Sequence, residues 1–160
     1  ETNVPTITPT VFNTVSDAVN IALCDLSERF SLSSIFPDGW VCLLQRPTTF
    51  VCTWAGVTCD SNNQVIGLDL SDLGLTGLLP DTLGNLNTLT SLDLSSNHLT
   101  GPLPNSFTEL QRLQSLELSG NNFSTSARRL LSDHRTESTS SFQIFDIVNV
   151  DQSLQIISNL

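Results

Sequence analysis

A leucine pattern with a fixed period constrains the fold of this chain more than any other feature. The motif Leu-Asp-Leu-Ser begins at Leu68 and again at Leu92, and its variant Leu-Glu-Leu-Ser begins at Leu116, so the period is 24 residues (92 − 68 and 116 − 92). A second motif, Leu-Thr-Gly-x-Leu-Pro, follows with the same period at 75–80 and 99–104. Such self-similarity predicts a solenoid, in which each repeat stacks on the next one.

The alternation within each motif places its leucines on one side of a short strand. Stacking the repeats removes these leucines from water, which stabilises the fold by roughly 1.5–3 kcal/mol for each buried side chain. Asn97 and Asn121 fall in the turn after each strand, where a buried amide can hydrogen-bond backbone groups that would otherwise be unsatisfied. The leucines expected in the core are Leu68, Leu70, Leu92, Leu94, Leu116 and Leu118.

Four cysteines precede the repeats, and their number and spacing favour disulfides. An even count in a short segment indicates two disulfides formed in an oxidising compartment. Zinc is the rival interpretation, but the segment has no Cys-x-x-Cys pair and no nearby histidine, so we expect neither a metal nor another cofactor. Four cysteines can pair in three ways, and the sequence alone leaves the pairing open. The residues are Cys24, Cys42, Cys52 and Cys59.

The segment before the repeats begins with a predicted helix. Ser16 is a suitable N-cap, and apolar residues recur at helical spacing as far as Phe30. These residues are Ala18, Ile21, Ala22, Leu26 and Phe30. Trp40 and Trp54 follow, and large aromatic residues beside disulfides are expected to pack the segment against the first coil.

The order of these motifs matches a known family. A helix and a tryptophan precede Cys52-Thr-Trp54-Ala-Gly56-Val-Thr-Cys59-Asp, and the repeats follow as Leu-Thr-Gly-x-Leu-Pro-x-x-Leu-Gly-x-Leu. This order resembles the plant-type extracellular leucine-rich-repeat proteins, including receptor-kinase ectodomains and polygalacturonase-inhibitor-like proteins. The resemblance implies an α/β leucine-rich-repeat solenoid, a short horseshoe of 3–4 repeats with a parallel sheet on its concave face. It also implies a helical N-terminal cap closed by a Cys52–Cys59 disulfide, which leaves Cys24 to pair with Cys42.

Four segments are expected from these patterns. Residues 1–15 form a flexible arm, 16–64 the N-terminal cap, and 65–123 the regular leucine-rich repeats. Residues 124–160 form a divergent repeat and a C-terminal cap, because Phe142-Gln-Ile-Phe145-Asp-Ile147 fits the strand motif once an insertion is allowed.

An acidic column is the candidate ligand-binding site. The residues between the paired inward leucines point outward, and they are Asp69, Asp93, Glu117 and, in the divergent repeat, Asp146. Adjacent strands lie about 4.8 Å apart, so the carboxylates form a narrow strip suited to a basic peptide or protein segment. The alternative is that the strip only keeps this face soluble, because solvated like charges cost little. Asn122-Phe-Ser124 is a sequon for glycosylation of Asn122.

The charge of the chain excludes several functions. A formal net charge of −10 disfavours nucleic acids and anionic membranes as partners. There is no apolar run long enough to span a bilayer and no catalytic constellation, so we do not expect an enzyme. We expect a secreted, extracellular recognition module that binds a peptide, protein or cell-wall ligand through its concave strand face. A structural or adhesive role with self-association through the terminal strand, and inhibition of a secreted hydrolase, are the alternatives.

Overall fold

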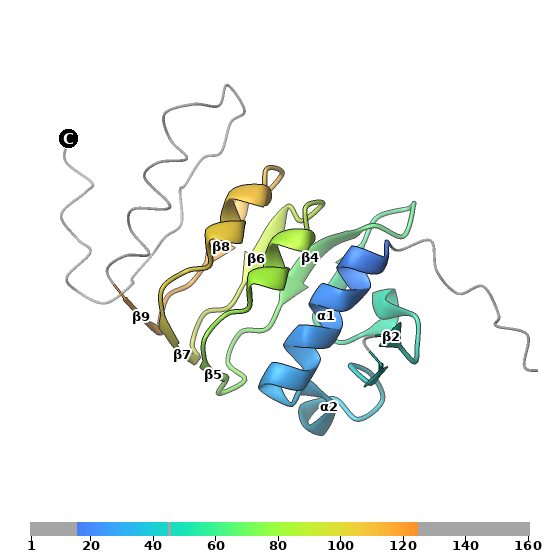
Figure 1. Ribbon diagram of the computed structural model, residues 1–160, viewed down its shortest axis with the longest axis horizontal. Coiled ribbons are helices and arrows are strands. Elements are labelled where there is room, and N and C mark those ends of the chain that lie inside the picture. Colours follow the sequence, from blue (N-terminus) through green and yellow to red (C-terminus); the bar gives the residue numbers. More distant parts are fainter. Residues whose placement is uncertain (1–15, 45, 125–160) are drawn as a thin grey trace, which may run out of the picture.

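Helix α1 (Asp17–Phe30) opens the part of the chain that the computed structural model describes, which comprises residues 16–44 and 46–124. The predictions for residues 1–15 and for 125–160, including Asp146, lie outside it. The described coils stack side by side, and α1 lies at one end of the stack (Figure 1).

Ser16 caps α1 as the sequence predicts, since its side chain accepts a hydrogen bond of 3.4 Å from the backbone N–H of Val19. Three of the predicted apolar positions, Ala22, Leu26 and Phe30, are buried. Ala18 and Ile21 have the same helical spacing but are exposed, so spacing alone does not define the buried face. The buried face is set by where α1 packs against the first coil, at the 3-10 helix η2 (Asp81–Asn85).

The cap continues with short elements that two disulfides hold together. After α2 (Leu32–Ile35), the strands β1 (Cys42–Leu43) and β2 (Arg46–Pro47) pair as an antiparallel hairpin. The 3-10 helix η1 (Val51–Thr53) then leads into β3 (Val57–Cys59).

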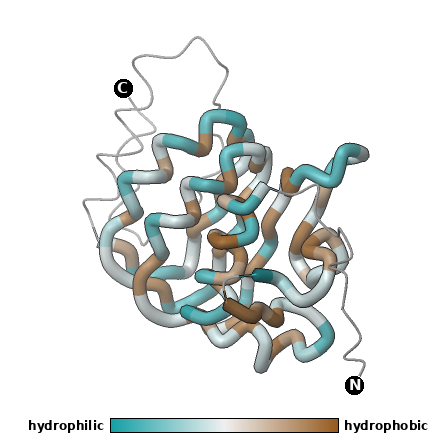
Figure 2. The backbone as a smooth tube through the Cα atoms, turned by 45° about the vertical axis from the view of Figure 1, so that its right-hand side comes forward, coloured by the Kyte–Doolittle hydropathy of each residue, from teal (hydrophilic) through white to brown (hydrophobic). Residues whose placement is uncertain are grey.

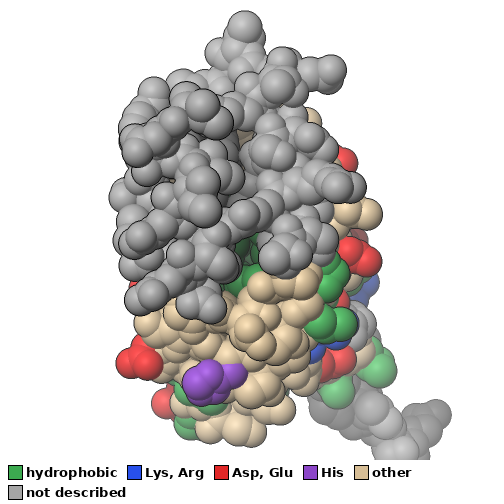
Figure 3. Space-filling view, turned by 90° about the vertical axis from the view of Figure 1, so that its left-hand side faces the viewer, with side chains coloured by type: hydrophobic (Ala, Val, Ile, Leu, Met, Phe, Trp, Pro, Cys, Tyr) green, Lys and Arg blue, Asp and Glu red, His purple; other side chains and the backbone are tan. Residues whose placement is uncertain are grey.

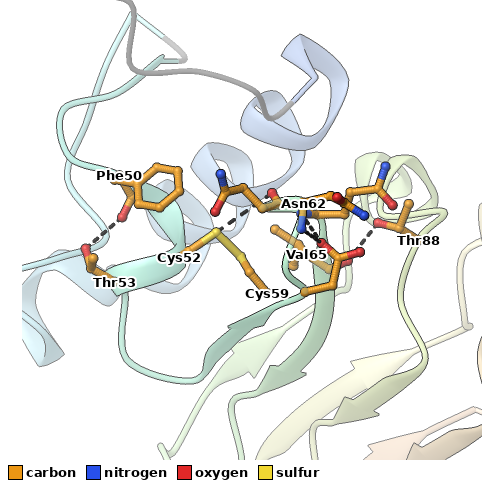
Figure 4. Close-up of a disulfide and its surroundings, with 10 residues drawn as sticks. Phe50, Cys52, Thr53, Cys59, Asn62, Val65 and Thr88 are labelled. Atoms are coloured by element: carbon orange, nitrogen blue, oxygen red, sulfur yellow. Dashed lines mark hydrogen bonds between the residues drawn. A yellow bond between two sulfur atoms is a disulfide. The ribbon is translucent and has the colours of Figure 1, made fainter.

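The pairing implied by the family resemblance is confirmed. The Cys24–Cys42 disulfide ties α1 to β1, and the Cys52–Cys59 disulfide ties η1 to β3. The second disulfide lies beside the loop that leads into the first repeat strand (Figure 4). Both bonds lie within the cap, and the cap joins the solenoid where β3 pairs with Val65–Asp69, the first repeat strand.

Trp40 and Trp54 form the core of the cap, as the sequence indicates. Both rings are buried, with centroids 4.9 Å apart. Each indole N–H has a partner, because Trp40 donates to the carbonyl of Ala55 at 2.9 Å and Trp54 donates to the hydroxyl of Thr49 at 2.7 Å. The aromatic pair is therefore buried without leaving a polar atom unsatisfied.

The repeats build two parallel sheets. The first contains β4 (Val65–Asp69), β6 (Ser91–Asp93) and β8 (Ser115–Glu117), with β3 added antiparallel at the β4 edge. The second contains β5 (Thr76–Gly77), β7 (His98–Gly101) and β9 (Asn122–Phe123). The 3-10 helices η2 and η3 (Asn105–Glu109) follow the second sheet in each coil and pack on one another (Figure 1).

The core is the leucine set that the period predicts. The most exposed of the six repeat-strand leucines is Leu116, at 7%. Apolar and polar residues alternate along each coil (Figure 2), and the repeat-strand leucines are buried in the stack. In residues 16–44 and 46–124, no helix is both long and apolar enough to cross a bilayer.

Asn97 and Asn121 hydrogen-bond backbone groups of the turns, as predicted, and these bonds also link successive coils. The Oδ1 atom of Asn97 accepts hydrogen bonds from the N–H groups of Leu73 and Leu75, at 3.1 and 2.9 Å. Its Nδ2 atom donates to three carbonyls, those of Leu70, Leu94 and Ser95. Asn121 repeats the arrangement one coil later, accepting from Leu99 and donating to Leu94 and Leu118. The two side-chain amides therefore supply hydrogen-bond partners to backbone N–H and C=O groups of the turns, which regular strand pairing does not satisfy.

Candidate ligand-binding surface

The strand face is the solvent-exposed side of β3, β4, β6 and β8, and it carries the acidic column. The parallel register places Asp69 beside Asp93 and Asp93 beside Glu117. With strands about 4.8 Å apart, the three carboxylates span roughly 10 Å. Asp69 is exposed, and the other two are half-buried. The structure therefore brings three of the four predicted contact residues into one row, and the fourth, Asp146, lies outside the described residues.

Two of these carboxylates also close the turns that follow their strands. Oδ1 of Asp69 accepts hydrogen bonds from the N–H and the hydroxyl of Ser71, at 3.0 and 2.7 Å. Oδ1 of Asp93 accepts the equivalent pair from Ser95, at 2.9 and 2.6 Å. Sequence reasoning missed this local role, although the repeated Asp-Leu-Ser spacing is the signal for it. The bonds hold each carboxylate in a defined orientation.

A row of hydroxyl groups runs beside the acidic column. Gly67 pairs with Thr58 of β3 on one side and with Ser91 on the other, and Ser91 pairs with Ser115. A Cβ atom at Gly67 would lie 3.0 Å from the hydroxyl oxygen of Ser91 and 3.1 Å from the Cβ of Thr58. Glycine at position 67 therefore lets Thr58 and Ser91 approach closely, and the row beside the acidic column consists of small side chains.

A shallow polar depression lies between two neighbouring loops, just before β6 and β8 begin. Its volume is about 310 Å³, and its lining mixes amide, hydroxyl and charged groups. These groups come from Asn87, Thr88, Glu109, Gln111 and Arg112.

The hairpin of β1 and β2 exposes two large apolar side chains that sequence reasoning also missed. Leu43 is 68% exposed and Leu44 is 89% exposed. No periodic signal marks them, because the hairpin belongs to the cap and not to a repeat. Within residues 16–44 and 46–124, no three His, Cys, Asp or Glu side chains are grouped as a metal site would require.

This architecture, a disulfide-closed cap followed by stacked coils with a parallel sheet, defines a leucine-rich-repeat solenoid. Residues 66–123 match the family described as leucine rich repeat. This match and the cap support a leucine-rich-repeat protein that is similar to the plant extracellular type.

Relatives of known sequence support this classification. Over 55 residues the chain is 42% identical to phytosulfokine receptor 1 of Arabidopsis thaliana, covering 33% of this chain and 5% of that receptor. Over 75 residues it is 34% identical to the LRR receptor kinase SERK2 of Oryza sativa subsp. japonica, covering 47% of this chain and 12% of the kinase. The chain thus spans a small fraction of the length of these relatives, and the similarity concerns their ectodomain-like region.

Solved structures give the same fold. The BIR2 ectodomain from Arabidopsis thaliana is 36% identical with a TM-score of 0.51, over 68% of this chain and 56% of that one. The HAESA LRR ectodomain from Arabidopsis, solved with an N-terminally extended IDA peptide hormone, is 31% identical with a TM-score of 0.52, over 67% of this chain and 17% of that one. The leucine-rich-repeat ectodomains are in general ligand-binding and non-enzymatic proteins.

Proposed function

We propose that this chain is an extracellular, non-enzymatic recognition module that binds a basic peptide or protein segment on its strand face. Asp69, Asp93 and Glu117 are the proposed contact residues, and Asp146 is the proposed fourth contact outside the described residues. The in-register row of three carboxylates carries this proposal.

The spacing of the row suits an extended ligand. Side chains on one side of an extended peptide recur about every 6.5–7 Å, and the outer carboxylates of the row are roughly 10 Å apart. Two basic side chains at alternate ligand positions can therefore pair with the row. The ligand in the HAESA structure is a peptide hormone, which supports a peptide as the class of ligand here.

The expected electrostatic contribution is modest. A solvent-exposed ion pair contributes about 0.2–1 kcal/mol, so two pairs contribute at most about 2 kcal/mol. The remaining affinity must come from backbone hydrogen bonds and from contacts to the hydroxyl row. Because salt screens exposed pairs, the electrostatic part should weaken as the ionic strength increases.

The test compares two double variants that remove the same charge. D69N/D93N neutralises two of the three carboxylates in the row, while an amide oxygen can still accept the bonds from Ser71 and Ser95. D38N/D81N neutralises two exposed acidic residues outside the strand face and serves as the control. Both substitutions in the first variant create an Asn-Leu-Ser sequon, so all the proteins must come from a host that does not glycosylate asparagine.

The probe is a set of extended peptides with arginine or lysine at alternate positions, compared with matching peptides that carry glutamate there. We expect the basic peptides to bind the parent protein and the control variant, and to bind D69N/D93N several-fold more weakly. Equal binding to D69N/D93N and the parent protein would refute the role of the column. The same binding assay with a cell-wall polysaccharide in place of the peptides tests whether the ligand is a polysaccharide and not a peptide.

A structural role is the second candidate, because Leu43 and Leu44 expose an apolar hairpin that could contact another copy. Light scattering behind size exclusion, across a concentration series, tests it on the non-reduced protein. Growth in mass with concentration that the L43S/L44S variant abolishes would favour assembly. A constant monomer mass would favour the recognition module.

A further inference from the structure

The polar depression before β6 and β8 holds hydrogen-bonding groups that the fold does not use. Thr88 donates its hydroxyl hydrogen to the carbonyl of Val65 at 2.7 Å, and its oxygen can still accept a bond (Figure 4). Glu109 and Arg112 line the depression with opposite charges but, within the described chain, form no ion pair with each other. The lining side chains without a hydrogen bond or ion pair to another described residue are those of Asn87, Glu109, Gln111 and Arg112.

These four side chains share a geometry that suits adjacent hydroxyl groups. An amide, a carboxylate and a guanidinium group are each planar, and each presents two polar atoms side by side. Such a pair of atoms can hydrogen-bond to two neighbouring hydroxyl groups at once, because every hydroxyl both donates and accepts. The depression has one positive and one negative side chain, so its formal charge is balanced. This chemistry matches a neutral molecule with several hydroxyl groups better than an ion or an apolar ligand.

We propose that the polar depression binds a neutral sugar unit of a glycan chain through adjacent hydroxyl groups. Its volume of about 310 Å³ lies at the lower end of the range of about 300–1,000 Å³ that is typical of ligand pockets, so it suits a small ring. Its described lining is polar throughout, so hydrogen bonds provide the recognition. This proposal does not depend on the peptide proposal, because it uses different residues.

The 24-residue period extends the amides of the depression into a row. Asn63, Asn87 and Gln111 occupy the same position before β4, β6 and β8 (87 − 63 and 111 − 87). The packing of the coils does not require amides there, because Asn87 and Gln111 are exposed. The buried positions are two residues later, at Leu89 and Leu113. Neighbouring strands lie about 4.8 Å apart, so the amides follow one another along the stack and suit successive units of a chain.

The depression and the acidic column lie at opposite ends of the same strands. The lining residues precede β6 and β8, which begin at Ser91 and Ser115. The carboxylates of the column, Asp93 and Glu117, are on the last residues of these two strands. The β9 end of the stack differs from both sites, since a histidine lies there in a mainly uncharged surface (Figure 3). A sugar unit in the depression and a peptide on the column therefore contact different residues.

The test measures the binding of neutral tetrasaccharides to the full, disulfide-bonded chain. The probes are cellotetraose, xylotetraose, mannotetraose and galactotetraose, and tetragalacturonate is the charged comparison. Saturation-transfer NMR detects binding, and titration calorimetry gives the Kd. We expect at least one neutral probe to bind more tightly than tetragalacturonate. Binding of tetragalacturonate alone, or of no probe at millimolar concentration, would overturn the proposal.

Two double variants locate the site. N87A/Q111A removes two amides of the depression without changing the charge, and both residues are exposed, so the fold is retained. N105A/Q114A removes an exposed asparagine and an exposed glutamine outside the depression and is the matched control. We expect N87A/Q111A to raise the Kd of the neutral probe at least about fivefold, and the control to leave it unchanged. An equal Kd for N87A/Q111A and the parent protein would contradict the assignment of the site.

The D69N/D93N variant separates this proposal from the peptide proposal. We expect it to bind the neutral probe as the parent protein does, whereas N87A/Q111A should bind the basic peptides normally. A neutral probe lost in D69N/D93N but retained in N87A/Q111A would place the sugar on the strand face and overturn the proposal. Failure of the recognition proposal and failure of this inference are therefore distinguishable.

Discussion

The strongest prediction concerns Asn97, whose side chain holds two coils together. The residue is 2% exposed, and its amide accepts two backbone N–H bonds and donates to three carbonyls. N97A would leave the N–H groups of Leu73 and Leu75 without this acceptor. A buried group left unsatisfied costs about 1–3 kcal/mol; the Leu75 donor is buried and the Leu73 donor is part-buried, so the two together give a loss of roughly 1–6 kcal/mol. That loss is a large fraction of the free energy of unfolding of a typical domain, which is about 5–15 kcal/mol.

Equilibrium unfolding in urea measures this loss as a reduced midpoint at an unchanged slope. N87A, at an exposed residue of the next loop, is the control and should change the free energy of unfolding by less than about 0.5 kcal/mol. N121A should cost less than N97A, because Asn121 is only half-buried and accepts one N–H bond instead of two. A loss below about 1 kcal/mol for N97A would refute the reasoning, since it would mean that the turn groups find other partners.

The cap supplies two further predictions. The Cys24–Cys42 disulfide closes a sequence separation of 18 and Cys52–Cys59 one of 7. Loop-closure entropy predicts that replacing both cysteines of the first disulfide by serine lowers the free energy of unfolding by about 3 kcal/mol, and doing so for the second lowers it by about 2.5 kcal/mol. The same urea unfolding measures both losses. A clearly larger loss for the second disulfide would contradict this account. Asn20 is 3% exposed and its Oδ1 has no hydrogen-bond partner, so N20L should raise the free energy of unfolding by about 1 kcal/mol. A clear loss of stability in N20L, with N87A again as the control, would show that the amide is satisfied in solution.

The acidic column has an observed role in closing turns and a proposed role in binding, and a mutational study must separate the two. Ser71 and Ser95 use one carboxylate oxygen of Asp69 and of Asp93, respectively, to close a turn. An alanine at either aspartate would therefore change both the charge and the turn. The asparagine variants keep an acceptor oxygen, so a change in binding reports the charge. Because these asparagine variants create new sequons, they must be produced in a host that does not glycosylate asparagine.

The 24-residue period is visible in the sequence alone, and it predicts most of the repeat region. A fixed period requires equivalent residues to stack, so the inward leucines, the turn asparagines and the row of Asp69, Asp93 and Glu117 could all be placed in advance. The disulfide pairing came from the family resemblance, because four cysteines alone allow three arrangements.

Features that depend on contacts between segments without a shared period required the folded structure. Helical spacing could not show that Ile21 faces solvent, because the buried side of α1 depends on where the first coil meets it. The period also could not reveal the exposed Leu44 of the cap hairpin, since the cap has no repeat. Asn121 and Asn122 are identical residue types in adjacent positions, and only the backbone direction at β9 turns one toward the core and the other toward solvent. Local sequence patterns determine the repeating unit because every coil packs against its neighbours in the same way. The ends, the cap and the exposed side chains depend on nonlocal contacts that occur only once in the molecule.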